Sequence, residues 1–318
     1  MRRGLWLVAV LAALSMAAAA CGNDNNKQGS AGSGTTVPTA CDQGTISGAG
    51  STFAQNIVQQ WSKDFQAKCS GATVTYQPVG SGAGIQQFTA GTIDFGGTDV
   101  PMSPTEEQSA VAKGGQVATI PWSGGGIAVE YNLSGVSGLK LSPATLAGIF
   151  AGKIKTWSDP AIKNDNTGAT LPSTGIQVVH RSDGSGTTAA FTGYLAAVAP
   201  TVWTAGAAKD VPWPTGQGAK GSDGVTAAVK QTAGALGYAE VSFAKGSQLG
   251  IASIKNASGA FVQHQNLPAR VAVPVRPHAR LPDRARRGLP VDDDVGHRLL
   301  RVDARRLHAH RLSRTCGR

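Results

Sequence analysis

The sequence is poor in aromatic side chains and lacks the short motifs that mark metal, nucleotide and hydrolase sites. Phe, Trp and Tyr make up 6% of its 318 residues, and the tryptophans are scattered, so no stacking platform for nucleic-acid bases is expected. No Cys-x-x-Cys pair and no His/Cys cluster suggests a metal. Neither a Gly-x-x-x-x-Gly-Lys-Ser/Thr loop nor a Gly-x-Ser-x-Gly elbow occurs. We therefore expect no metal and no cofactor.

A marked excess of positive charge is also missing from most of the chain, although the net charge is +10. The segment from Arg270 to Arg318 contains 13 Arg and 5 Asp, with no Lys and no Glu. The remainder is nearly balanced in charge. Basicity is thus a property of the tail and not of a folded surface, which argues against nucleic acid as a partner.

The N-terminus has the pattern of an export signal. Arg2 and Arg3 precede an apolar run over residues 5–20, which ends in small residues followed by Cys21. The run is too short for an ordinary transmembrane helix. We predict a signal peptide over residues 1–20 and a lipid on the Cys21 thiol, as in a bacterial lipobox; the alternative is an ordinary signal peptide with an incidental cysteine. Residues 21–43 would then be a polar tether outside the cell membrane.

Two further cysteines, Cys41 and Cys69, follow in the exported part. Disulfides form in such compartments, so the two could be bridged. The sequence leaves open whether they form this bond or remain separate thiols.

Strand, glycine-rich turn and helix recur in that order along the chain. The segments 45–53, 74–84 and 178–188 each carry β-branched residues that lead into small residues before a helical stretch. Such units build an α/β fold in which ligand contacts gather at the carboxyl ends of strands.

The third of these segments has the chemistry of an oxyanion site. Arg181 offers a planar fork to two oxygens, and Asp183 can hold that fork still. Ser185, Gly186 and Thr187 offer hydroxyls and free amides at a helix N-terminus, where anions are stabilised. A tetrahedral oxyanion is therefore the predicted ligand. His180 has no second histidine or carboxylate at a spacing that would suggest catalysis. We therefore interpret it as a strand-end residue and not as a catalytic base.

Five motifs occur in one order, and together they resemble a known family. These are the stretches 48–53, 80–84, 94–99, 152–157 and 181–187. The chain from about residue 45 to 261 is similar to the periplasmic phosphate-binding proteins of ABC-type phosphate importers (PstS-type). The resemblance implies a two-lobed α/β fold, the type II periplasmic-binding-protein fold. It also implies a monomeric binding protein without catalysis, which delivers inorganic phosphate to a membrane permease.

The resemblance also assigns roles in phosphate binding. Thr52 and Phe53 would give backbone N–H groups, Thr52 its hydroxyl, and Ser81 a hydroxyl and an amide. Arg181 would make the forked contact, while Ser185, Gly186 and Thr187 line the second lobe. Asp99 would accept the proton of hydrogen phosphate, which sulfate lacks at neutral pH, so sulfate would face an unpaired carboxylate.

The domain boundaries follow from the same resemblance. We expect lobe I at residues 44–122, lobe II at 123–250 and a return to lobe I at 251–262. In residues 263–318 the hydrophobic residues follow neither a helical nor a strand periodicity, and the segment is rich in Arg, Pro, Ala and Val. This composition is typical of a GC-rich gene read out of frame, and a disordered basic tail is the alternative. Lobe I would then be incomplete at its C-terminal part.

Three alternatives to phosphate delivery stay open. A binder of a related oxyanion such as arsenate would use the same residues. A phosphate-ester hydrolase would need a nucleophile with a base, and none is evident. A truncated, nonfunctional product is the third, since loss of part of one lobe's core can exceed the few kcal/mol that stabilise a domain.

Overall fold

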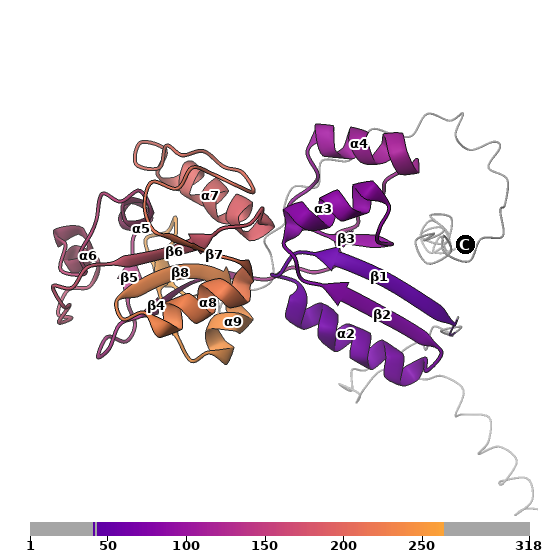
Figure 1. The fold of residues 1–318 in the computed structure, drawn as a ribbon. Coiled ribbons are helices and arrows are strands. Elements are labelled where there is room, and N and C mark those ends of the chain that lie inside the picture. The colour runs from indigo at the N-terminus through magenta and orange to yellow at the C-terminus, as the bar shows by residue number, and fades with distance from the viewer. Residues whose placement is uncertain (1–40, 42, 264–318) are drawn as a thin grey trace, which may run out of the picture. The chain divides into compact units, whose positions relative to one another are not determined.

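The computed structural model describes residue 41 and residues 43–263 (Figure 1). The predicted signal peptide, Cys21, nearly all of the tether and all but the first residue of the basic tail lie outside these residues. The described part forms two α/β lobes, which we call lobe I (residues 44–114) and lobe II (residues 127–262).

Lobe I is a three-stranded parallel sheet with the strand order β2-β1-β3. Its elements are, in chain order, β1 (Gly44–Gly50), α2 (Gln55–Lys68), β2 (Ala72–Gln77), α3 (Ser81–Ala90), β3 (Phe95–Gly97) and α4 (Pro104–Gly114). In Figure 1, α2 lies on one side of the sheet and α3 and α4 on the other. Right-handed crossovers require this arrangement, because β2 and β3 flank β1 on opposite sides.

Lobe II is built on a five-stranded sheet with the order β7-β6-β8-β4-β9. Its strands are β4 (Ile127–Asn132), β6 (Gln177–Arg181), β7 (Gln217–Ala219), β8 (Ala235–Glu240) and β9 (Gly250–Ile251). Its helices are α5 (Pro143–Phe150), α6 (Pro160–Asp165), α7 (Gly186–Val198), α8 (Gly221–Gln231) and α9 (Val241–Gly246). A large apolar core with Phe150, Trp157 and Tyr238 fully buried holds these elements together.

The return to lobe I predicted for residues 251–262 is wrong. Strand β9 pairs with β4, while β10 (Ser253–Lys255) pairs with β5 (Lys140–Leu141) and β11 (Phe261–Val262) pairs with β10. All of these partners belong to lobe II. Ala252 is buried in the lobe II core, so burial of this segment there determines its pairing.

Lobe I carries an open apolar groove on its sheet. The groove has a volume of about 250 Å³ and is lined by Val58, Trp61, Val74, Tyr76, Phe95, Gly96, Gly97 and Trp122. The indole rings of Trp61 and Trp122 meet edge to face at 5.3 Å, yet their residues are 47% and 41% exposed. Exposed apolar surface of this kind marks either a binding surface or missing cover. We call it the lobe I groove.

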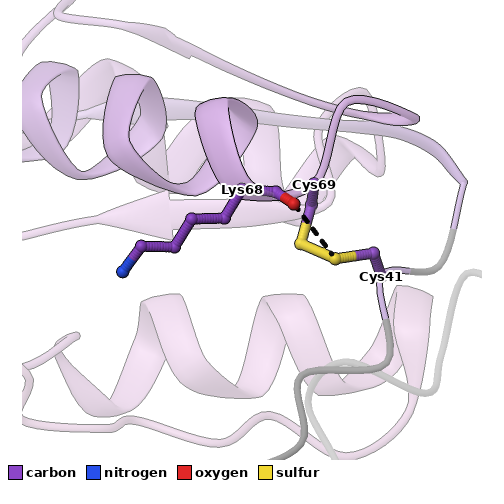
Figure 2. Close-up of a disulfide and its surroundings, with 3 residues drawn as sticks. All are labelled: Cys41, Lys68 and Cys69. Atoms are coloured by element: carbon purple, nitrogen blue, oxygen red, sulfur yellow. Dashed lines mark hydrogen bonds between the residues drawn. A yellow bond between two sulfur atoms is a disulfide. The ribbon is translucent and has the colours of Figure 1, made fainter.

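Cys41 and Cys69 form a disulfide, one of the two arrangements that the sequence left open (Figure 2). Cys69 is the C-cap of α2, and Cys41 lies three residues before β1 begins. The bond therefore ties the start of the described chain to the end of α2 within lobe I. The Cys41 sulfur lies 3.6 Å from the carbonyl oxygen of Lys68, and a dashed line marks this contact in Figure 2.

Candidate functional site

The carboxyl end of β1 begins the site in lobe I. Gly50 has φ 146°, and a Cβ there would meet the Gly97 carbonyl oxygen at 2.1 Å, so only glycine allows β1 and β3 to approach here. The next residues, Ser51 and Thr52, are buried with their hydroxyls directed to polar partners. The Ser51 carbonyl accepts a hydrogen bond from the Tyr76 hydroxyl at 2.9 Å, which fixes the turn.

Ser81 brings an unpaired hydroxyl into the site from the first position of α3. Its side chain is 1% exposed, and its Oγ has no hydrogen-bond partner among the described residues. A Cβ on Gly186 of lobe II would lie 2.7 Å from this Oγ, so the hydroxyl faces the start of α7. A buried hydroxyl without a partner is costly, and a ligand oxygen would satisfy it.

Arg181 ends β6 and supplies the positive charge of the site. Its Nε lies 2.7 Å from Asp183 Oδ1 and its terminal nitrogen 2.5 Å from Oδ2, as the sequence predicted for the fork and its holder. Burial raises the pKa of Asp183, but the hydrogen bonds and charge of Arg181 outweigh it and leave that pKa below its usual value. The Gly221 N–H also donates to Asp183, at 3.1 Å. Arg181 is thus 3% exposed, and its guanidinium is fixed in direction.

The core of lobe II aligns β6 with α7. The Tyr238 hydroxyl accepts from the Arg181 N–H at 3.3 Å and lies 2.6 Å from Thr188 Oγ1. Burial raises the pKa of Tyr238 to about 12, so the hydroxyl stays protonated. Ser185 is the N-cap of α7, where its Oγ accepts from the Thr188 N–H at 3.0 Å. The Thr187 amide is engaged by Asp99, so the Ser185 hydroxyl proton and the Gly186 amide are the groups of this turn that remain for a ligand.

Asp99 joins the two lobes at the centre of the site. Its Oδ1 accepts a short hydrogen bond from Ser51 Oγ, and its Oδ2 accepts from Thr187 Oγ1 of lobe II at 3.0 Å. Burial raises the pKa of Asp99, although the hydrogen bonds from Ser51 and Thr187 and the charge of Arg181 oppose this. The carboxylate therefore competes for the same hydroxyls that a bound oxyanion would use.

Two residues of this cluster were not predicted from the sequence. Ser51 holds Asp99, and Ser222 at the start of α8 meets Thr52 across the lobes. The Thr52 Oγ1 lies 3.0 Å from Ser222 Oγ and accepts from the Ser222 N–H at 3.1 Å. The signal for Ser222 was present, because Gly221–Gly224 is another small-residue turn that opens a helix.

The structure brings most of the predicted residues together, with one exception. Close contacts join lobe I to lobe II at Asp99 with Thr187, Ser81 with Gly186, and Thr52 with Ser222. The predicted amide of Phe53 is already engaged, since it donates to Ser51 Oγ at 3.1 Å.

The described residues lack two kinds of feature. In residues 43–263, no group of three His, Cys, Asp or Glu side chains could hold a metal ion. No helix within that range is long and apolar enough to cross a membrane.

Comparisons with known proteins identify the class of this chain. The PBP superfamily domain matches residues 35–277. The solved structure of a high-affinity periplasmic phosphate-binding protein (PfluDING) bound with phosphate superposes with a TM-score of 0.57 at 26% identity, over 70% of this chain and 65% of that one. A substrate-binding protein of a putative phosphate ABC transporter from Clostridium perfringens, at 22% identity and a TM-score of 0.53, shows the same fold over 66% of this chain and 76% of that one. The chain thus has the type II periplasmic-binding fold, as predicted.

Two relatives identify the family within that class. Phosphate-binding protein PstS 3 of Mycobacterium tuberculosis is 42% identical over 256 residues, which is 79% of this chain and 69% of the relative. Phosphate-binding protein PstS of Pasteurella multocida is 47% identical over 223 residues, covering 69% of this chain and 63% of the relative. The chain belongs to the PstS family of phosphate-binding proteins, which confirms the resemblance seen in the sequence.

Proposed function

We propose that this chain binds inorganic phosphate where lobes I and II meet and delivers it to an ABC-type phosphate permease, without catalysis. The names of its PstS relatives support the ligand. The donor set supports the same conclusion: a fixed guanidinium at Arg181, buried hydroxyls and the N-terminus of α7 all suit a tetrahedral oxyanion.

The observation that carries the proposal is the placement of the Asp99 carboxylate among these donors. An acceptor beside an anion is repulsive unless the ligand brings a proton. Hydrogen phosphate brings one, whereas sulfate does not at neutral pH. Burial raises the pKa of Asp99, so its surroundings already disfavour the charged form, and an unpaired contact with sulfate adds to that cost.

Calorimetric titration of the purified chain tests this proposal. We expect phosphate to bind at least about 100-fold more tightly than sulfate. Asp99→Asn should weaken phosphate, strengthen sulfate and reduce the ratio at least about tenfold, because the amide can donate to either anion. Asp64→Asn, an exposed change on α2, serves as the matched control. Tight sulfate binding by the unaltered chain would refute the role of Asp99.

Arsenate is the related oxyanion that the same titration must include. It is tetrahedral and protonated at neutral pH, so it meets every requirement named above. Equal affinity for arsenate and phosphate would leave the site chemistry intact and broaden the ligand class.

The setting of the protein follows from its N-terminal sequence. We infer export, lipid attachment at Cys21 and a monomer that docks on its permease at the outer face of the cell membrane. Mass spectrometry of the N-terminal peptide from the membrane fraction tests the lipid, and an unmodified, cleaved peptide would exclude it.

A second candidate is a product with an incomplete lobe I, and the lobe I groove favours it. If a covering segment is missing, the folded chain should bind an apolar fluorescent dye such as anilinonaphthalene sulfonate. A combined Trp61→Ser and Trp122→Ser change should remove most of that signal, while Val198→Ser, an exposed apolar change on α7, should not. A folded chain that binds no dye would count against this candidate, and the DNA of codons 255–275 would show directly whether the frame changes.

A further inference from the structure

Lys209 makes two contacts that connect the anion-binding turn of lobe II to lobe I. Its backbone carbonyl accepts from the Ser185 N–H at 2.8 Å, so it sits directly behind the N-cap of α7. Its Nζ lies 2.5 Å from Oε1 and 2.6 Å from Oε2 of Glu106, a residue in α4 of lobe I. One residue thus holds Ser185 with its main chain and reaches the other lobe with its side chain.

Glu106 is itself fixed by its own helix. Its Oε2 accepts from the Ser103 N–H at 2.8 Å, and its N–H donates to Ser103 Oγ at 3.3 Å, which completes a capping box. Burial raises the pKa of Glu106, but the hydrogen bonds from Lys209 and Ser103 outweigh it and keep that pKa below its usual value. The carboxylate is ionised and preorganised, so little freedom is lost when Lys209 binds it.

The contact lies outside the ligand cluster but joins the segments that carry it. Ser103 follows Asp99 by four residues, and Lys209 holds Ser185. The side chains of Lys209 and Glu106 are 20% and 28% exposed, so their attraction is partly screened by water and salt. Such an ion pair stabilises the contact between the lobes, although neither of its residues belongs to the ligand cluster.

We propose that Glu106 and Lys209 form an interlobe latch. It holds the turn that contains Ser185, the N-cap of α7, against lobe I and slows release of the anion. This latch rests on the proposed function, because its effect on the release rate is measured with phosphate. In a hinged binding protein the ligand leaves after the lobes separate, so a contact made only between closed lobes lowers the dissociation rate. Ligand choice stays with Asp99 and Arg181.

Two single variants isolate the ion pair from the helix cap. Glu106→Gln removes the charge but keeps the capping box, because Gln at this position accepts the same Ser103 N–H. Lys209→Met removes the ammonium and keeps the carbonyl that holds Ser185. Glu107→Gln, one residue along α4, is the matched control, since the structure gives Glu107 no ion pair within residues 43–263.

Stopped-flow measurement of phosphate release at low and high salt gives the first test. We expect Glu106→Gln and Lys209→Met each to raise the dissociation rate about 3- to 10-fold at low salt, with the association rate changed less than about twofold. Both variants should lose most of the salt dependence of release. The double variant Glu106→Gln with Lys209→Met should release phosphate at most about twofold faster than either single variant, because each change alone already breaks the ion pair.

A scattering measurement without phosphate separates the latch from the proposed function. The radius of gyration of the ligand-free chain should increase in Glu106→Gln and not in Glu107→Gln, because an open state becomes more populated. Equal values in both, or a double variant in which the two single effects on release simply multiply, would overturn the latch. Failure of the unaltered chain to bind phosphate would instead overturn the proposed function, and the scattering comparison would still decide the latch.

Discussion

Replacing Arg181 by Met is expected to weaken phosphate binding at least about 100-fold. The guanidinium is the only buried cation among the described residues of the site, and it is held by Asp183 at 2.7 and 2.5 Å. Loss of a buried charged hydrogen-bond partner typically costs 2–5 kcal/mol, and the Asp183 charge would then repel the anion. Calorimetric titration with phosphate measures the change.

A companion variant separates binding from stability. Arg181→Met leaves Asp183 buried without its partner, so the melting temperature should also fall. Adding Asp183→Asn should restore part of the stability but not the affinity, because the fork is still absent. A dissociation constant for Arg181→Met within about threefold of the unaltered chain would show that the anion does not bind at this turn.

The second large effect is expected from Glu130, which no part of the proposed function uses. This residue of β4 is fully buried, and its two carboxylate oxygens share the Thr226 hydroxyl of α8 at 2.9 and 3.1 Å. Burial raises the pKa of Glu130 from 4.5 to about 7, although the Thr226 hydrogen bond opposes this. The folded protein therefore binds a proton here that the unfolded chain has already lost near neutral pH.

The direction of the pH effect follows from that difference. Between about pH 4.5 and pH 7 the folded state holds more protons than the unfolded state, so the free energy of unfolding falls as the pH rises. Below this range both states are protonated and no penalty exists. Above it Glu130 is ionised in both, and the full cost of burying the charge, about 3 kcal/mol, is present.

Urea unfolding at pH 5, 6, 7 and 8 measures this effect. Glu130→Gln keeps the shape and the Thr226 hydrogen bond but cannot ionise, so it should stabilise the protein at pH 8 and change it little at pH 5. Burial also raises the pKa of Asp99, but Asp99 is present in both proteins. The difference in stability between them therefore excludes its contribution. Parallel stability curves for the two proteins would contradict the prediction.

Local patterns in the sequence could place neighbouring polar residues together but not residues that lie far apart in the chain. Arg181 and Asp183 lie two positions apart at a strand end, so the fork and its holder could be placed from the sequence alone. Asp99 and Thr187 are 88 residues apart, and only the resemblance to a family suggested that they meet. Nothing in the sequence indicated that Glu106 and Lys209 pair, since charged residues of this kind usually lie on the solvent-exposed surface.

The pairing of the last strands could not be predicted in the same way. Strands β9, β10 and β11 have two or three residues each, which is too short for an alternating pattern to show. The partners of β9 and β10 lie in β4 and β5, far back in the chain, and burial of Ala252 in the lobe II core fixes the choice; β11 then pairs with β10. Propensity and spacing carry no information about such distant contacts.

The disulfide has a mechanical consequence for a protein held by its N-terminus. A pull on the chain before Cys41 passes through the bond to Cys69 and into α2, so the load enters lobe I at two points. Strand β1, the central strand of this sheet, then does not carry the whole load. If Cys21 carries the lipid, lobe I is the half of the clamp that the tether reaches first, and lobe II, with Arg181 and Ser185, is attached to the membrane only through lobe I.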